Sequence, residues 1–272
     1  MSIASSLSLL TFNIANPSAQ RAERQLAWLA SRDEDVLILT ETKASEGCRL
    51  LVDAFRSAGY DVIYPEPEPG EYGSMIISRV RADALDFGAR IGYLPARAAA
   101  AALPTPDGPI CVLGFYVPSR DAGAKKTERK KKWLSACLTA LTEPPAAPTV
   151  LMGDLNVLEP GHEPHYPFFV PFEYDFYRAL TDDHGLVDAY RHLQPNAIEH
   201  SWVGRTGDGY RYDHAFCSRV IRDRISACQY LHQPRLERLS DHSALTMRLK
   251  AAPSEALPIS DPIATTTAPT LF

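Results

Sequence analysis

VLMGDLNV, residues 150–157, decides the fold of this chain because it joins an apolar run directly to polar residues. The run PTVLMG (148–153) predicts a strand that is buried on both faces. Asp154 and Asn156 follow two positions apart, and in extended backbone their side chains point the same way. A carboxylate can hold or orient a water, and a carboxamide can donate hydrogen bonds to a phosphate oxygen. Taken alone, the segment is equally typical of an Asx turn after a strand.

Three further apolar runs carry acidic residues or a histidine at their ends. DVLILTETK ends a predicted strand with Glu41, where α/β sites tend to form, although a lone Glu is more often plain surface. RYDHAFCS begins a strand with Asp213, which suits either the orientation of an imidazole or an ordinary salt bridge. RLSDHSALTMRL places Asp241 and His242 before a strand, which fits a metal ligand beside a proton-handling group or a solvated loop.

Asn13 and Tyr116 also follow apolar runs, so polar islands lie at strand ends from one end of the chain to the other. Strand ends that deliver carboxylates, carboxamides and an imidazole to one place can build an oxygen-rich metal site beside a base. That combination is the equipment for breaking a phosphodiester with Mg²⁺.

The bulk composition is that of an ordinary globular protein, with 272 residues, 45% hydrophobic and 22% charged. Either one large domain or two small ones would fit this length. No apolar run is long enough for a membrane span, and the start MSIASSLSLLTF lacks the features of a signal peptide, so neither is expected. Five scattered cysteines without a C-x-x-C pair argue against disulfides and zinc and favour a reducing cytoplasm. The net charge of −5 does not indicate a nucleic-acid-binding protein. It does not exclude one either, because local patches of charge matter more than the net charge.

Hydrophobic periodicity predicts strands outnumbering helices. Helices are expected over 18–31, 46–58, 127–142 and 173–184. Strands are expected over 6–12, 35–40, 60–64, 73–79, 98–103, 110–116, 148–153, 198–203, 211–217, 224–231 and 244–249. We predict one α/β domain over 1–250 with two sheets packed face to face, and a disordered tail over 251–272, where Pro, Ala, Thr and Ser leave little to bury.

The motifs carry a family resemblance in their order. TFN, TETK, GFYVPS, GDLN, SW, RYD and SDH together resemble the endonuclease/exonuclease/phosphatase superfamily over residues 7–249. Within it, GLVDAYRH followed by SW, and the placement of Arg97 nineteen residues before Tyr116, are most similar to the exonuclease III type of abasic-site endonuclease. The resemblance implies a four-layer α/β sandwich, with two mixed β-sheets packed face to face and flanked by helices, and a site at one rim.

The resemblance also implies a role for each matching residue. The cofactor would be Mg²⁺, with Mn²⁺ as an alternative, held chiefly by Glu41 and completed or supported by Asn13 and Asp241. The groups contacting the scissile phosphate would be Tyr116, Asn156 and His242. Asp154 would align and deprotonate the attacking water, Asp213 would pair with His242 and fix its tautomer, and Trp202 would wall the pocket for the sugar next to the cut.

Three functions from different classes follow. The first is a DNA nuclease of exonuclease III type in DNA repair, acting as an abasic-site endonuclease, a 3′-5′ exonuclease or both, and expected to be a cytoplasmic monomer without membrane contact. The second is a phosphodiesterase or phosphatase of the same superfamily acting on RNA, nucleotides or other phosphate esters. The third is a catalytically inactive binding module, which should lack some of the catalytic residues, and all of them are present.

Two segments leave alternatives open. The basic run KKTERKKK (125–132) either tracks a phosphate backbone through residues such as Lys125 and Lys126 or is the solvated start of a helix. Tyr210 is a further candidate for substrate stacking, and Arg97 for substrate binding. Residues 159–177 do not fit the exonuclease III pattern and form either a substrate-shaping lid or a hydrophobic plug, of which the plug is favoured; the residues concerned are His162, His165, Tyr166 and Phe169.

Overall fold

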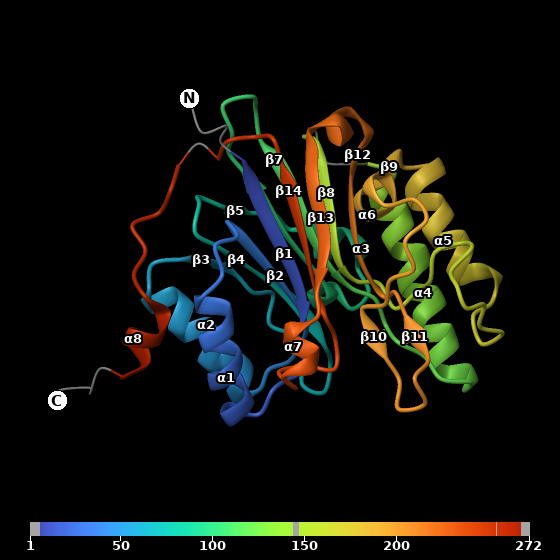
Figure 1. Ribbon diagram of the computed structural model, residues 1–272, viewed down its shortest axis with the longest axis horizontal. Helices are drawn as coiled ribbons and strands as arrows, with labels where there is room; N and C mark the ends of the chain where they lie inside the picture. Colours follow the sequence, from blue (N-terminus) through green and yellow to red (C-terminus); the bar gives the residue numbers. More distant parts are fainter. Residues whose placement is uncertain (1–5, 144–146, 254, 268–272) are drawn as a thin grey trace.

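The computed structural model describes residues 6–143, 147–253 and 255–267. Two six-stranded mixed sheets pack face to face (Figure 1). The first sheet has the order β13-β14-β1-β2-β4-β3, with bounds Ile225–Leu231, Ala244–Leu249, Leu7–Asn13, Val36–Thr42, Gly73–Ser78 and Asp61–Ile63. The second has the order β5-β6-β7-β8-β12-β9, with bounds Asp83–Ala84, Ala98–Leu103, Ile110–Tyr116, Thr149–Asp154, Asp213–Ser218 and Leu186–Asp188. A separate hairpin pairs β10 (Trp202–Val203) with β11 (Gly209–Tyr210).

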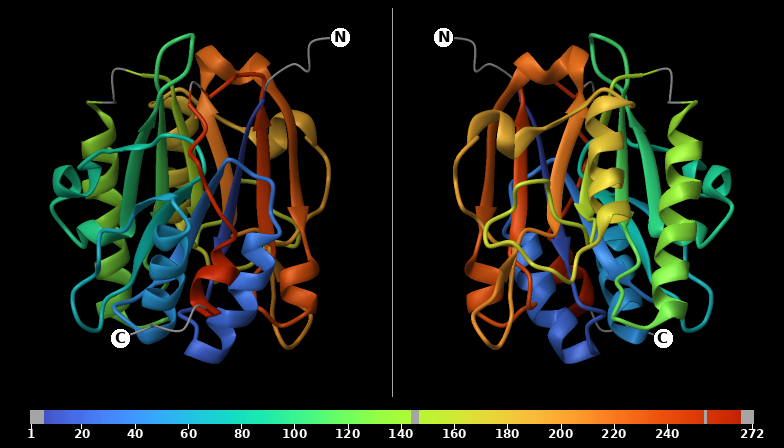
Figure 2. Two further views of the ribbon diagram at one scale, coloured as in Figure 1. Left: turned by 90° about the vertical axis from the view of Figure 1, so that its left-hand side faces the viewer. Right: turned by 90° about the vertical axis from the view of Figure 1, so that its right-hand side faces the viewer.

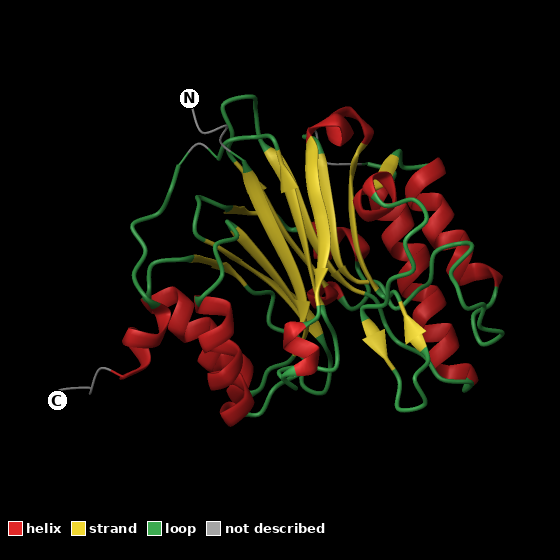
Figure 3. Ribbon diagram, viewed as in Figure 1, coloured by secondary structure: helices red, strands yellow, loops and turns green. Residues whose placement is uncertain are grey.

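Helices cover the outer faces of both sheets, which gives four layers (Figure 3). Over the first sheet lie α1 (Ala19–Ala30) and α2 (Glu46–Ser57), and over the second lie α4 (Ala124–Leu141) and α5 (Pro171–Asp182). The shorter helical elements are α3 (Phe87–Ile91), η1 (Pro95–Arg97), α6 (Ala189–Leu193), η2 (Arg219–Arg224), α7 (Gln233–Leu236) and α8 (Pro262–Thr267). The predicted α/β sandwich is therefore confirmed. No described helix meets the length and apolar character needed to cross a membrane.

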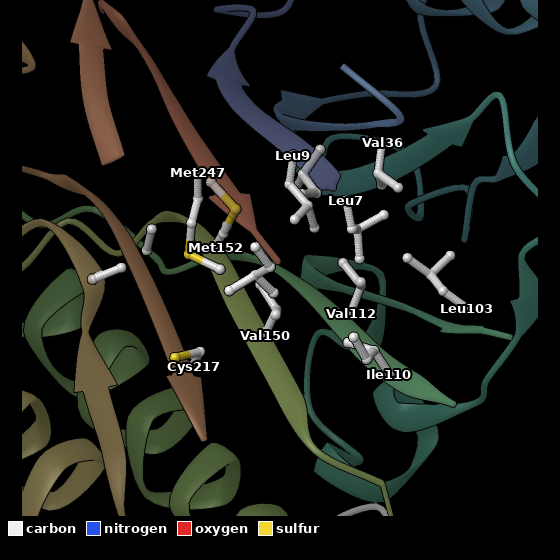
Figure 4. Packing of buried hydrophobic residues seen from close by; sticks show 14 of the residues in the cluster. Leu7, Leu9, Val36, Leu103, Ile110, Val112, Val150, Met152, Cys217 and Met247 are labelled. Carbon is white, nitrogen blue, oxygen red and sulfur yellow. The ribbon is translucent and has the colours of Figure 1, made fainter. Parts of the chain in front are cut away.

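The two sheets bury side chains alternately toward each other and toward the helices. In β1, Leu7 and Leu9 join the core between the sheets, while Leu10 and Phe12 join the core under α1 and α2. Figure 4 shows the inter-sheet core, where Leu9 and Met152 are among the packed side chains. Strands buried on both faces explain the continuous apolar runs of the sequence. All five cysteines are buried free thiols.

Strand direction brings the polar islands to one rim. β1 and β2 run parallel, as do β7 and β8, and the ends of these four strands carry Asn13, Glu41, Tyr116 and Asp154. β12 runs antiparallel to β8, so its first residue, Asp213, pairs with Asp154 at the same rim. The rim lies at the lower end of the sheets in Figure 1, beside the β10–β11 hairpin.

Two predictions about elements are wrong. The strand expected over 198–203 shrinks to the two residues of β10, because its partner β11 is equally short. The described part of the expected disordered tail is docked: Leu257 N donates to Arg79 O (2.9 Å), Ser260 N donates to Ala58 O (2.8 Å), and α8 packs on α1 and α2 (Figure 2). Satisfied backbone groups hold a segment whose side chains offer little to bury. Residues 254 and 268–272 of that tail lie outside the described residues, and the single domain over 1–250 stays a prediction.

Candidate functional site

Five of the predicted residues meet around one amide group. Nδ2 of Asn13 donates to Glu41 Oε2 (3.0 Å) and to Asp154 Oδ2 (2.9 Å), and it lies 3.5 Å from His242 Nε2. On the other side of the imidazole, His242 Nδ1 donates to Asp213 Oδ2 at 2.7 Å. All except Glu41 are buried. Residues 229 positions apart along the chain therefore share one polar centre.

The orientation of Asn13 differs from its predicted role as a metal ligand. Its amide oxygen accepts a hydrogen bond from the backbone N–H of Ala15 at 2.8 Å. Turning the amide over would set two donors against each other, so this contact fixes which atom faces the site. Asn13 presents N–H groups to Glu41 and Asp154 and acts as a donor that ties the two carboxylates together.

Glu41 reaches the site through an irregularity in β2. The pairing of β2 with β4 shifts register between Thr40 and Thr42, and Glu41 between them has φ 59°. Such a bulge re-aims a side chain, and a left-handed non-glycine residue costs about 1–3 kcal/mol that the surrounding structure must offset. Burial raises the pKa of Glu41, the hydrogen bond from Asn13 and the charge of His242 oppose the rise, and the nearby carboxylate of Asp241 adds to it.

The end of β8 combines close packing with a second left-handed residue. Gly153 has φ 151°, and a Cβ there would lie 2.0 Å from the carbonyl oxygen of Phe115, so only glycine fits between β7 and β8. Asn156 has φ 49°, and its Nδ2 donates to Asp154 Oδ2 (3.1 Å) and Val117 O (3.0 Å). Both amide hydrogens of Asn156 are thus used within the protein. In this conformation Asn156 positions Asp154 and does not offer the predicted donor to a phosphate.

Two buried groups of the centre, Asp154 and His242, have shifted pKa values. Burial, together with the charge of Asp213 on the neighbouring strand, raises the pKa of Asp154 to about 7. Burial alone would lower the pKa of His242, but the carboxylates of Asp213, Asp154 and Asp241 outweigh it and raise the pKa to about 10. Residues with strongly shifted pKa values are common at functional sites. The arrangement offers a carboxyl poised near neutral pH beside a cationic imidazole.

Asp241 and Trp202 meet at the edge of this centre. Nε1 of Trp202 donates to Asp241 Oδ2 at 2.9 Å, and Trp202 also bridges to His242 through its backbone. The predicted stacking role of Tyr210 is wrong, because both faces of its ring are covered. Tyr166 stacks on it at 4.2 Å between ring centroids and Tyr212 at 5.2 Å. Tyr166, Tyr210 and Tyr212 form an aromatic stack that the sequence alone did not indicate.

Arg97 lies behind the site and not on its surface. It is 3% exposed, its Nη1 donates to Tyr116 O (3.2 Å), and its guanidinium lies 4.8 Å from the centroid of the Tyr116 ring. The predicted direct contact with substrate is therefore wrong, and Arg97 supports Tyr116. Tyr72, which no motif singled out, packs its ring at 5.8 Å from that of Tyr116, and Lys43 Nζ lies 4.1 Å from the Tyr72 ring. Lys43 follows Glu41 in the TETK motif, which was its only sequence signal.

The basic run 125–132 is not a uniform phosphate-tracking stripe. Lys130 is buried and donates to Asn156 O (2.5 Å) and Glu173 Oε1 (2.6 Å). Lys126 pairs with Asp121 at 2.8 Å on the exposed first turn of α4, and Lys125 is also exposed there. The run divides between a buried support of the site and solvated side chains, so the predicted phosphate contacts of Lys125 and Lys126 have no support from the geometry.

Residues 159–177 are fastened to the core by buried charges. The wholly buried Arg211 donates to Glu159 (3.0 and 2.7 Å) and to Asp188 (2.7 Å). Arg191 also donates to Glu159, at 2.6 Å. We call Arg211, Glu159, Asp188 and Arg191 the Arg211 cluster. His162 Nε2 accepts from Arg211 N at 3.2 Å. The segment is a fixed wall against the aromatic stack, in agreement with the plug interpretation, with Phe169 buried and Tyr166 half-exposed.

The residues present fit a hard divalent cation with few protein ligands. Among the described residues, no three His, Cys, Asp or Glu side chains are grouped to hold a metal. Mg²⁺, however, usually keeps several waters and takes one or two carboxylates together with substrate phosphates. The carboxylate of Asp241 raises the pKa of Glu41 at the rim, and a cation held there would relieve that repulsion.

Solved structures share this fold over most of their length. An AP endonuclease from Archaeoglobus fulgidus superposes with TM-score 0.76 at 24% identity, covering 89% of this chain and 98% of that one. The 3′ phosphatase NExo from Neisseria, bound to a product DNA hairpin, gives TM-score 0.77 at 22% identity, covering 89% and 99%. AP endonuclease LMAP from Leishmania major gives TM-score 0.72 at 19% identity, covering 92% and 89%.

The sequence itself matches a family over residues 10–242. That range contains every residue of the polar centre, from Asn13 on β1 to His242 before β14. The chain belongs to the endonuclease/exonuclease/phosphatase family.

Proposed function

We propose that this protein is a divalent-metal-dependent nuclease of exonuclease III type that hydrolyses phosphodiester bonds in DNA. The observation that carries the proposal is the buried Asp213–His242 pair, 2.7 Å apart, whose imidazole faces the amide of Asn13 and the two carboxylates that the amide ties together. Family membership supports a phosphodiester-hydrolysing enzyme. A catalytically inactive module would have no reason to keep this arrangement.

The side chains divide the work of hydrolysis. Asp154, with a pKa of about 7, accepts the proton of the attacking water, and Asn13 and Asn156 hold its carboxylate in place. The His242 imidazolium, oriented by Asp213, stabilises the negative charge that develops on the phosphate oxygens. The Tyr116 hydroxyl stays protonated, because burial raises its pKa well above the usual value, and it donates a hydrogen bond to Glu41 at the same rim.

Glu41, with Asp241 nearby, is the group we propose to hold the cation, Mg²⁺ first and Mn²⁺ as the alternative. When bound, a divalent cation would neutralise charge on the scissile phosphate and polarise the phosphoryl group. Glu41→Ala and Asp154→Ala are each expected to lower kcat by at least ~10²-fold, the scale of losing one preorganised group.

DNA is the proposed substrate because of what the structural relatives are. AP endonucleases and an enzyme bound to a DNA hairpin share the fold over nearly their whole length. We propose action at abasic sites, at 3′ ends, or at both, in DNA repair. The five buried thiols, without disulfides among them, support a cytoplasmic setting, and a monomer is the proposed state.

A cleavage assay tests the proposal. The purified protein is incubated, with Mg²⁺ or with EDTA, with matched duplexes that contain or lack an abasic site, with single-stranded DNA, with RNA and with bis-p-nitrophenyl phosphate. We expect Mg²⁺-dependent cutting of DNA, abolished by EDTA and by Glu41→Ala. Release of nitrophenol without cutting of any nucleic acid would favour a phosphodiesterase for other esters and contradict the nuclease.

A further inference from the structure

We propose that a cavity next to the polar centre binds a backbone phosphate of the cut strand. This phosphate is the neighbour of the scissile phosphate. The cavity measures about 430 Å³ and is lined by Arg21, Val203, Arg235, Arg238, Ser240 and Asp241. We call Arg21, Arg235 and Arg238 the arginine pocket. The inference rests on the proposed nuclease function and names a contact that this function does not supply.

The three guanidinium groups arrive from separate elements. Arg21, on α1, donates from Nη2 to the carbonyls of Ala15 and Asn16 just beyond β1, while its Nε is buried without a hydrogen-bond partner. Arg235, at the end of α7, donates from Nε to Ser243 Oγ at 3.1 Å. These contacts fix the two side chains from behind and leave further N–H groups for a ligand.

Arg238 completes the pocket from the loop before Asp241. It is exposed and has φ 56°, a left-handed conformation that a non-glycine residue adopts at a cost of about 1–3 kcal/mol. Its backbone N–H donates to Arg235 O at 3.1 Å, which keeps the two residues in one turn. Helix α7 and the loop that follows it thus bring two arginines to the cavity.

The pocket gathers three arginines, without ion pairs to any described residue, into the lining of one cavity. Elsewhere on the surface, Arg81, Arg222 and Arg224 each lie within 3.3 Å of a carboxylate. In contrast, among the described residues, none of the three arginines of the pocket forms an ion pair within 4.0 Å. Three positive charges face one carboxylate, Asp241, in a protein of net charge −5. This excess of positive charge suits a bound anion. The planar guanidinium group can donate two parallel hydrogen bonds to the oxygens of a phosphate.

The position of the pocket identifies the phosphate. Asp241 lines the cavity and also accepts a hydrogen bond from Trp202 at the polar centre, and Val203 of the same hairpin forms another wall. A strand whose scissile phosphate lies at His242 therefore passes the pocket as it leaves the site. The occupant we infer is a phosphodiester of that strand, and free inorganic phosphate is the competing source of the same chemistry.

Binding in EDTA, where no cleavage occurs, tests the pocket. Fluorescence anisotropy with a labelled single-stranded oligonucleotide is measured over a range of salt for the wild type, Arg238→Gln and the Arg235→Gln/Arg238→Gln pair. The matched control is Arg219→Gln, an exposed arginine on η2 at the far end of the sheets. We expect about tenfold weaker binding per arginine removed at low salt. The slope of log K against log salt should become shallower by about one unit for each.

Activity on two substrates separates the possible outcomes. The pocket variants should lose at least tenfold more kcat/KM on the oligonucleotide than on bis-p-nitrophenyl phosphate, which has no adjacent phosphate. Equal losses on both substrates, or salt slopes equal to that of Arg219→Gln, would overturn the inference while the nuclease stands. Competition by inorganic phosphate at millimolar concentration, with no change in the salt slope of the variants, would assign the pocket to the free ion and overturn it as well. A wild type that binds and cuts no nucleic acid would refute the proposed function itself.

Discussion

The substitution Lys130→Met tests whether this buried lysine supports the site, in contrast to the exposed lysines of the same basic run. Lys130 Nζ donates to Asn156 O at 2.5 Å and to Glu173 Oε1 at 2.6 Å. Asn156 has φ 49°, and its amide holds Asp154. Methionine keeps much of the aliphatic stem of the lysine but removes the only side-chain donor to Asn156 O among the described residues.

The structure indicates a small effect on stability and a large one on turnover. Burial lowers the pKa of Lys130 even though Glu173 raises it, so the charged amine contributes little net stability. Glu173 also keeps its ion pair with Arg120 at 2.6 Å, so the substitution leaves no uncompensated charge. We expect a change of about 1–2 kcal/mol in the free energy of unfolding, or roughly 2–8 °C in Tm. A shift of the loop by about 1 Å would cost kcat about 10- to 100-fold.

The neighbouring Lys131 provides the control. It is exposed, pairs with Glu128 on the same helix at 3.1 Å, and lies 5.4 Å from the centroid of the Phe172 ring. Steady-state kinetics on the cleaved DNA substrate and thermal unfolding are measured for Lys130→Met and Lys131→Met. We expect kcat to fall only for Lys130→Met, with KM within about twofold. Equal kcat values for the two variants, both well folded, would refute the idea that Lys130 positions Asn156.

The other predictions concern the imidazole, the buried charges and acid. Asp213→Asn should lower kcat by about 10²–10⁴-fold with little change in KM, because the His242 ring loses the carboxylate that orients it; unchanged kcat would exclude this role. Arg211→Met should cost about 3–5 kcal/mol in urea unfolding, because two buried carboxylates lose their shared cation; an unchanged midpoint would contradict it. Burial would raise the pKa of both carboxyls of the Arg211 cluster, but their arginines hold each pKa below the usual range. Stability from the cluster is therefore complete above about pH 4–5 and lost as the pH falls, so denaturant titrations from pH 7 to pH 3 should show a smaller loss in Arg211→Met than in the wild type.

Continuous apolar runs made the sheets predictable. Residues 35–40 and 148–153 were expected as buried strands, and the structure has Val36–Thr42 and Thr149–Asp154. Strands covered on both faces carry their own signal in the sequence, whereas β10 and β11, with two residues each, do not. The docking of residues 251–253 and 255–267 also had no signal, because backbone groups make the contacts, as in the bond from Leu257 N to Arg79 O.

The burial of Lys130 did have a signal in the sequence. Lys130, Trp133, Leu134 and Cys137 are spaced as one face of a helix, and all four are buried. Composition alone grouped this lysine with its exposed neighbours in KKTERKKK, where periodicity would have separated it. The coverage of Tyr210 by Tyr166 had no such signal, because the two rings come from segments 44 positions apart.

Side-chain orientation at the rim is where sequence patterns fail for a physical reason. Glu41 and Asn156 have φ of 59° and 49°, and each departs from the regular backbone that alternation assumes. The motifs TETK and GDLN placed both residues at the correct strand ends, but in neither case does period-two reasoning give the direction of the side chain. Contacts with distant residues supply that direction: Asn13 Nδ2 for Glu41, and Lys130 Nζ for the backbone of Asn156. The chemistry of this rim is therefore set by strained positions that the rest of the fold holds in place, and variants of the residues that hold them should alter turnover before they alter stability.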